Sequence, residues 1–376
     1  MFTKLFDMLK LPHNKRLRTV IKSFLITVFS VLIFVGVGIF IWNRTIVPPE
    51  IVVPTGPIAV PPTNIEPPQT NNTEQYNDEN IYDEPTPEYV WPFPERMADD
   101  RRELFYTFLI IGLNEGTNVN TAMVASYCAA TREANLISIP RDAPVHATRN
   151  GRKMASSYLI GAGGGRGTPG GVAQVQHDVL NVIGFIPDFY VVFDYDAFFA
   201  IIDAVGGIEI YVPIRMRYRD PYQNLDIDIM PGLQHMDSAT ALDFARFRQA
   251  NRNSGYPSLP DGDFGRIRNQ QAVINAVINE LLRPSNILQI PTFVNIFNDS
   301  VHTNLTIPNM MFFAMELNHV MGTDDFNTYT FLPTHTSGDP HWYEFLNPNA
   351  ILEIVNRTIN PFYQYIELRD INIVRE

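Results

Sequence analysis

Apolar residues follow three different patterns along this chain. An uncharged apolar run covers residues 23–42, a proline-rich polar stretch follows it, and from about residue 99 short apolar runs alternate with amphipathic segments. The run at 23–42 is long enough to cross a bilayer as a helix. Its length and the absence of a small-residue cleavage site argue against a cleaved signal peptide. We therefore predict a tail at 1–22 and a transmembrane helix at 23–42.

Basic residues predict the orientation of that helix. Six lysines and arginines precede it within residues 1–22, whereas residues 45–95 contain none. Because positive charge is retained on the cytoplasmic side, the N-terminus is expected in the cytoplasm and the bulk of the chain outside. The predicted location is the cell membrane, with a single pass and an extracytoplasmic domain.

Residues 43–98 have the composition of a linker. The stretch 45–95 carries twelve prolines, nine acidic residues and no basic residue. Such a sequence buries too little apolar surface to fold, and its prolines favour an extended conformation. We predict a disordered, semi-rigid acidic tether between membrane and domain.

Residues 99–376 read as a folded domain that mixes strands and helices. Buried strands are predicted at 104–113, 121–130 and 134–140, and apolar spacing predicts helices within 172–185 and 262–284. Asp263 is a candidate N-cap and Pro284 a stop for the second helix. Strand, helix and strand follow each other again in 188–213, and the tail from Ser285 adds about two helices and a strand at 327–333. We predict an α/β fold, a three-layer α-β-α sandwich with a mixed central sheet.

Composition excludes several classes of function. The formal net charge of −12 argues against a nucleic-acid partner, and the single cysteine, Cys128, excludes an intrachain disulfide. The histidines lack the paired spacing of a zinc enzyme, and no nucleophile elbow is present. The glycine-rich stretch 161–171 lacks the spacing of a P-loop, so it is either a phosphate cradle or a flexible lip.

Arginines nevertheless concentrate in residues 241–271 of this acidic chain. Arg246 and Arg248 are two apart, which on a strand would point both side chains to one side. Arg266 and Gln270 are four apart in the first turns of the predicted helix, where backbone N–H groups attract anions. Arg141 directly follows a predicted strand. If these side chains converge, they suit a doubly charged anion such as pyrophosphate; a solvated basic face is the alternative.

Four blocks resemble the LytR-CpsA-Psr family in order and spacing. They are "LIIGLNEGTNVNTAMVASY", "NLISIPRDAPV", "ALDFARFR" and "GDFGRIRNQQ", and the resemblance is strongest over residues 109–282. It implies an α-β-α domain with a lipid pocket. The implied function is transfer of a glycopolymer from a polyprenyl-pyrophosphate carrier onto cell-wall peptidoglycan, mainly in Gram-positive bacteria. An older label of the family is transcriptional attenuator.

The resemblance also implies roles for particular residues. Arg141, Arg266 and Gln270 would act in catalysis. The pyrophosphate would be held by Arg141, Asp142, Arg246, Arg248, Arg266 and Gln270, with Asp142 orienting Arg141. The arginines would stabilise the charge that develops during phosphoryl transfer.

The chain departs from the family pattern where a divalent metal is expected. The two family aspartates that hold Mg²⁺ are replaced by Asn114 and Asn120, and an arginine between them by Asn118. A neutral amide is a much weaker ligand for Mg²⁺ than a carboxylate. Glu115 would replace one ligand if the loop were shifted by a residue.

Two further family positions differ, and three functions therefore stay open. Ala155 and Asn269 stand where the family has asparagine and arginine. The chain is an active phosphotransferase with altered metal dependence, a relative that binds lipid-linked pyrophosphate as a carrier or envelope regulator without turnover, or a structural wall-facing module.

Overall fold

The computed structural model describes a defined set of residues, and every structural statement below concerns them. They are 48–51, 100–114, 117–146, 152–162, 169–223, 225–283, 285–286, 289–320, 326–337 and 342–374. The predicted transmembrane helix and nearly all of the predicted linker lie outside this set. Within it, no helix is both long and apolar enough to cross a membrane.

A six-stranded mixed sheet forms the centre of the domain, with strand order β10-β3-β2-β1-β4-β9. Its strands are β1 (Phe105–Leu113), β2 (Val119–Cys128), β3 (Glu133–Ile139), β4 (Phe189–Phe193), β9 (His302–Thr303) and β10 (Phe326–Thr330). β2 runs antiparallel to β1 and β3, whereas β4 is parallel to β1 and β10 is parallel to β3. The sequence correctly predicted the first three strands and the mixed α/β class.

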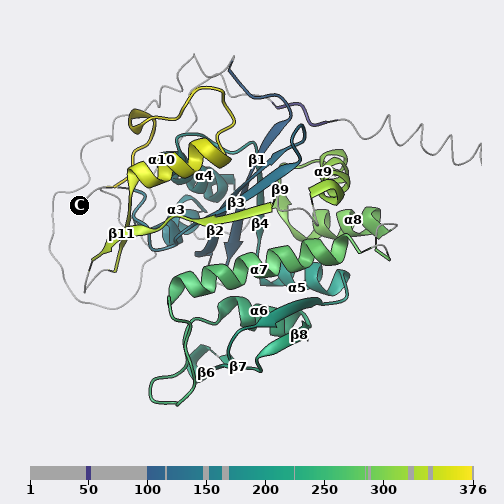
Figure 1. Cartoon of the computed structure of the whole chain (residues 1–376), viewed down its shortest axis with the longest axis vertical. Helices are drawn as coiled ribbons and strands as arrows, with labels where there is room; N and C mark the ends of the chain where they lie inside the picture. The colour runs from purple at the N-terminus through teal and green to yellow at the C-terminus, as the bar shows by residue number, and fades with distance from the viewer. Residues whose placement is uncertain are drawn as a thin grey trace, which may run out of the picture. The chain divides into compact units, whose positions relative to one another are not determined.

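Helices cover both faces of this sheet (Figure 1). One face packs against α3 (Ser157–Ala162), α4 (Pro169–Ile183) and α10 (Pro348–Thr358). The other faces α5 (Tyr195–Ala204), α6 (Ser238–Arg246), α7 (Asp263–Leu281), α8 (Ile290–Ser300) and α9 (Ile307–Val320). Alternation along the strands divides their side chains between these two layers.

Two antiparallel hairpins extend the layer of α6 and α7. β5 (Ile208–Val212) pairs with β8 (Gly232–Met236), and β6 (Met216–Asp220) pairs with β7 (Leu225–Ile229). Their buried side chains join a second apolar cluster with α6 and α7. The sequence pattern predicted β5, but it did not predict β6, β7 and β8 or the two hairpins that these strands form.

The C-terminal part of the chain returns to the first strands. It contains three helices, α8 to α10, where about two were predicted, and the short hairpin of β11 (Pro333–Thr336) and β12 (Glu344–Leu346). The backbone N–H of Glu344 donates to the carbonyl of Asp142, 3.1 Å away. This bond brings β12 to the end of β3, where the predicted arginine site begins.

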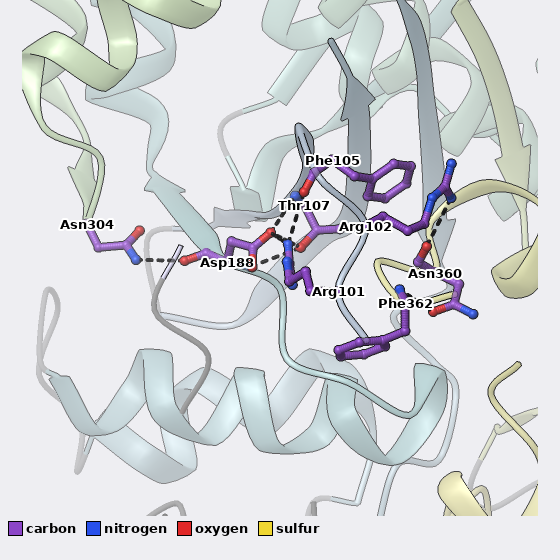
Figure 2. Close-up of polar contacts among 8 residues, drawn as sticks. All are labelled: Arg101, Arg102, Phe105, Thr107, Asp188, Asn304, Asn360 and Phe362. Carbon is purple, nitrogen blue, oxygen red and sulfur yellow. Dashed lines mark hydrogen bonds and ion pairs between the residues drawn. The ribbon is translucent and has the colours of Figure 1, made fainter. Parts of the chain in front are cut away.

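A buried carboxylate fixes the N-terminal end of the domain. Figure 2 shows Arg101 and Thr107 converging on Asp188, just before β4. One Asp188 oxygen accepts from Arg101 Nη2 at 2.5 Å and from the backbone N and hydroxyl of Thr107 at 2.8 and 2.7 Å. Burial raises the pKa of Asp188, and the Arg101 charge opposes that rise. The polar contacts thus tie the entering chain to β1 and β4.

Two local predictions were wrong. Arg246 and Arg248 do not share a strand, because α6 runs to Arg246 and Arg248 follows it. The Asp237 cap and the buried apolar side of "ALDFA" favour a helix there. Asp263 is not the N-cap of α7 but its first residue, since Gly262 occupies the cap and Asp263 pairs with Arg266 instead.

Candidate functional site

The arginine site is built where β3 ends and α7 begins. Arg141 is the second residue after β3, held by a 2.8 Å bond from the backbone N–H of Ala155 to its carbonyl. Arg266 lies in the first turn of α7 and is 8% exposed. Burial is the main cause that lowers the pKa of Arg266 to about 10; the charges of Arg141 and Arg248 act in the same direction, and Asp263 and Asp142 oppose the shift. Arg141 and Arg248 are therefore each close enough to repel Arg266.

Carboxylates are interleaved with these cations. Asp263 contacts Arg266 Nη2 at 2.8 Å and Arg248 Nη1 at 3.9 Å. Asp142 lies 3.7 Å from Arg141 Nε, but its shorter ion pair, at 2.7 Å, is with Lys153. The predicted orienting role of Asp142 thus has a competitor that sequence reasoning did not identify. We call Arg141, Asp142, Lys153, Arg248, Asp263, Arg266 and Glu344 the clamp.

Arg246 and Gln270, the other two predicted site residues, line an apolar cavity of about 430 Å³. Arg246 also lies over the ring of Tyr195, 5.5 Å from its centroid. The cavity is lined by residues of the sheet and of α5 to α9. Residues of α7 supply much of its helical wall: Val273, Ile274, Val277, Ile278 and Leu281.

A second apolar cavity of about 210 Å³ lies beside the first, between α5, α7, α8 and α9. Both are lined by Phe108, Ile201, Leu281, Phe297 and Phe313. The Phe108 and Phe313 rings meet edge to face, with centroids 4.8 Å apart. The two cavities are therefore neighbours, and the second lies toward α8 and α9.

The residues at the family metal positions do not fit Mg²⁺. The Asn114 side-chain oxygen accepts from the backbone N–H of Asn118 at 2.9 Å, and the Asn120 oxygen accepts from Arg141 Nη1 at 3.2 Å. Both amide oxygens are thus engaged within the protein, and neither carries the charge that a hard cation prefers. No group of three or more His, Cys, Asp or Glu residues could hold a metal ion within the described ranges. Glu115, the possible replacement, lies outside them.

Asn120 joins the clamp to the cavity. It lines the cavity and its side chain binds Arg141. Asn269, at a family arginine position, instead ties α7 to α6, because its amide donates to the Phe244 carbonyl at 3.0 Å.

Close packing of two helices accounts for two glycines of the glycine-rich stretch. A Cβ on Gly161 would lie 2.2 Å from the carbonyl oxygen of Gly170, so α3 and α4 can approach this closely only because both residues are glycines. Residues 163–168 of that stretch lie outside the described set.

Sequence reasoning missed Glu344, which β12 brings to the clamp. The residue is 4% exposed. Its pKa is raised to about 7, mainly by burial and also by the nearby Asp263 and Asp142, while Arg266 and Arg141 oppose the rise. The sequence feature that could have indicated it is a single carboxylate within the apolar run "WYEFL". Burying a carboxylate costs free energy, so an acid in a run that is expected to be buried is a candidate functional residue.

The described part of the chain thus places a group of cations beside an apolar cavity. A model of the LytR_cpsA_psr family matches residues 97–358. The chain belongs to this family, as its sequence blocks indicated.

Curated relatives are transferases and regulators. The chain is 29% identical to the polyisoprenyl-teichoic acid–peptidoglycan teichoic acid transferase TagV of Bacillus subtilis, over 50% of this chain and 45% of TagV. It is 25% identical to the regulatory protein MsrR of Staphylococcus aureus, over 65% of this chain and 68% of MsrR. The match thus spans under half of TagV.

Solved structures share the fold. The B. subtilis TagV crystal structure has a TM-score of 0.56 at 21% identity, covering 68% of this chain and 96% of that one. TagT bound to LI-WTA has a TM-score of 0.54 at 17% identity, covering 69% and 91%.

Proposed function

We propose that this chain transfers a glycopolymer from a polyprenyl-pyrophosphate carrier onto peptidoglycan. One observation carries the proposal: Asn120 lines the apolar cavity and binds Arg141, so the arginine clamp continues directly into the cavity. An apolar tail would enter the cavity while its pyrophosphate meets the clamp. Relatives named as teichoic acid transferases support this substrate class.

In this proposal the clamp stabilises the transferring phosphoryl group. Arg141, Arg248 and Arg266 would neutralise negative charge on the phosphate oxygens, while Arg246 and Gln270 hold the head at the cavity wall. Guanidinium groups match phosphate geometry and stay charged, so they suit this role. The reaction would place the domain outside the membrane, tethered by the predicted helix at 23–42 and the linker.

We propose further that divalent metal does not act at Asn114 and Asn120. Their oxygens are neutral and already engaged, which supports two functions. Either the cationic clamp suffices for transfer, or the chain binds lipid-linked pyrophosphate without turnover. The second is favoured only if the missing carboxylates prove essential.

The test uses the full-length protein in detergent, a polyprenyl-pyrophosphate-linked disaccharide and a peptidoglycan oligomer. Lipid binding and polyprenyl phosphate release are measured with Mg²⁺ and with EDTA, beside Asn114→Asp/Asn120→Asp. We expect turnover by the unaltered chain that EDTA does not abolish. Binding without turnover, with turnover gained by the variant in Mg²⁺, would instead establish the binding-only function.

A matched pair of variants controls for charge. Arg246→Ala/Arg248→Ala should lower lipid affinity at least 100-fold, because two head-group cations are lost. Arg215→Ala/Arg217→Ala removes the same charge at the same spacing from the β6–β7 hairpin, where those side chains pair with Asp228 and Asp226. It should leave affinity within about twofold. Equal affinities in both double variants would remove Arg246 and Arg248 from the proposed head-group site.

A further inference from the structure

Within the described part of the chain, one carboxylate of the clamp forms no ion pair with a cation. Asp142 is paired with Lys153 at 2.7 Å, and one oxygen of Asp263 with Arg266 at 2.8 Å. Glu344 is buried, and its Oε2 atom has no hydrogen-bond partner within the described protein. Asp263 Oδ1 also lacks a hydrogen bond, but it lies 3.9 Å from Arg248 Nη1. A buried polar atom without a partner is costly, so a specific need must retain it.

The clamp atoms that lack a hydrogen bond could all be satisfied by one bound group. Within the described protein, Arg141 Nε and Arg266 Nε are also buried without a hydrogen bond, although Arg141 Nε lies 3.7 Å from Asp142, and both arginines interact electrostatically with Glu344. Two donors and two acceptor oxygens are thus available within one cluster. A group that both accepts and donates hydrogen bonds, such as a phosphate together with a hydroxyl, would complement this set.

We propose that Glu344 accepts the proton of the peptidoglycan hydroxyl when that hydroxyl attacks the pyrophosphate, an inference that rests on the proposed transfer function. Transfer needs a base, because the hydroxyl must lose its proton as its oxygen bonds to phosphorus. Arginine and protonated lysine cannot accept it, and no carboxylate stands at positions 114 and 120 to activate the hydroxyl through a metal. Among the described residues, Glu344 is the clamp carboxylate for which the structure shows no ion pair.

The proposed step balances. The hydroxyl oxygen forms a bond to the phosphorus that carries the glycan, and the bond from this phosphorus to the bridging oxygen breaks. The electron pair of that bond leaves with polyprenyl phosphate, and the hydroxyl proton moves to the Glu344 carboxylate. The clamp arginines stabilise the departing phosphate, which therefore needs no proton from an acid.

The surroundings of Glu344 suit this role. Asp142, Asp263, Arg141 and Arg266 act on it electrostatically. In its own hairpin it pairs with Thr336, next to His335, and follows Tyr343, whose ring lies 4.5 Å from the Arg152 guanidinium carbon. A pKa near 7 keeps a base available at neutral pH while still binding a proton strongly. Bound pyrophosphate adds negative charge, which moves this titration to higher pH.

The decisive variant is Glu344→Gln, which keeps the shape and removes the basic oxygen. In the full-length protein, with the disaccharide lipid and peptidoglycan oligomer above, kcat should fall 100- to 10,000-fold. Lipid affinity should hold or increase, because a negative charge leaves the clamp. The unaltered protein should gain activity as pH rises above 7, because bound pyrophosphate raises the pKa of Glu344, and should then level off. The remaining activity of Glu344→Gln should lack this rise.

Two variants complete the test. Glu344→Asp keeps a carboxylate and should recover part of the rate together with the pH profile. Glu280→Gln removes another buried glutamate, paired with Arg283 at 2.9 Å near the far end of α7, and should leave kcat within about threefold. If Glu344→Gln keeps the rate and pH profile of the unaltered protein, the base is another group while transfer stands. If the unaltered protein binds lipid but never turns it over, both the transfer function and this role fall.

Discussion

The two faces of the central sheet are built from similar residues, yet one is filled and the other is hollow. Leu109 and Ile111 point to the face covered by α3, α4 and α10, and neither exposes any surface. Phe108 and Ile110, their neighbours in the same strand, line the cavity. Tight packing on one face gives the domain its stability, whereas the opposite face leaves space that a ligand can use.

The helices account for this difference. On the filled face, Tyr158, Val175 and Val355 are fully buried against the sheet. On the hollow face, large aromatic residues such as Phe193, Phe198 and Phe313 surround the cavity. Apolar composition therefore does not distinguish a filled core from a cavity; the difference lies in how closely the helices pack against the sheet.

The largest expected effect compares two adjacent isoleucines. Ile111→Ala should destabilise the domain by about 2–5 kcal/mol, because it opens a new cavity in a filled layer. Ile110→Ala should cost less than half as much, since its side chain already borders empty space. Urea unfolding of the two full-length variants measures both values. Equal losses would mean that the two faces are packed alike.

The next largest effect is the pH dependence of stability that Glu344 causes at the clamp, beside the hollow face. The pKa of Glu344 is about 7 in the folded protein, against an ordinary value of 4.5, so the folded state holds this proton more tightly than the unfolded chain. Stability from this group therefore falls as pH rises from 4.5 to about 7 and is constant above. At about 1.4 kcal/mol per tenfold change in proton affinity, the loss is on the order of 3 kcal/mol.

Glu344→Gln should remove that loss. The variant is expected to exceed the unaltered protein in unfolding free energy by on the order of 3 kcal/mol at pH 8. The difference should shrink to near zero at pH 4.5, as followed by urea unfolding at both values. Functional residues often lower the stability of a fold. If the variant is instead less stable than the unaltered protein at pH 8, the Glu344 carboxylate stabilises the fold.

Sequence patterns correctly predicted those features that depend on neighbouring residues alone. The apolar runs that became β1, β2 and β3 were recognisable because both faces of these strands are buried. Arg141 and Arg266 were placed correctly near a strand end and a helix start. Their convergence, however, depends on how α7 packs against β3, where Gln271 donates to the Ser138 hydroxyl at 2.9 Å.

The remaining parts of the site required tertiary structure. Arg246 and Arg248 were assigned to one strand because their spacing allows it, although the Asp237 cap begins a helix that ends at Arg246. Glu344 reaches the clamp only through the β11–β12 hairpin and the bond to Asp142. Such contacts between distant segments leave no periodic trace in sequence, which is why this residue escaped prediction.

The smallest expected effect on stability comes from filling the cavity. Val277, on α7, lines it, and Val277→Phe should change the unfolding free energy by less than about 1 kcal/mol, because the larger side chain finds room. Val175→Phe places the same ring in the filled face, where Val175 has no exposure, and should cost about 1–3 kcal/mol or more. Lipid binding separates the pair further. Val277→Phe should weaken binding of the disaccharide lipid at least tenfold, since the ring competes with the tail for the same volume, whereas folded Val175→Phe should bind normally. Normal binding by Val277→Phe would place the lipid tail somewhere other than the hollow face of the sheet.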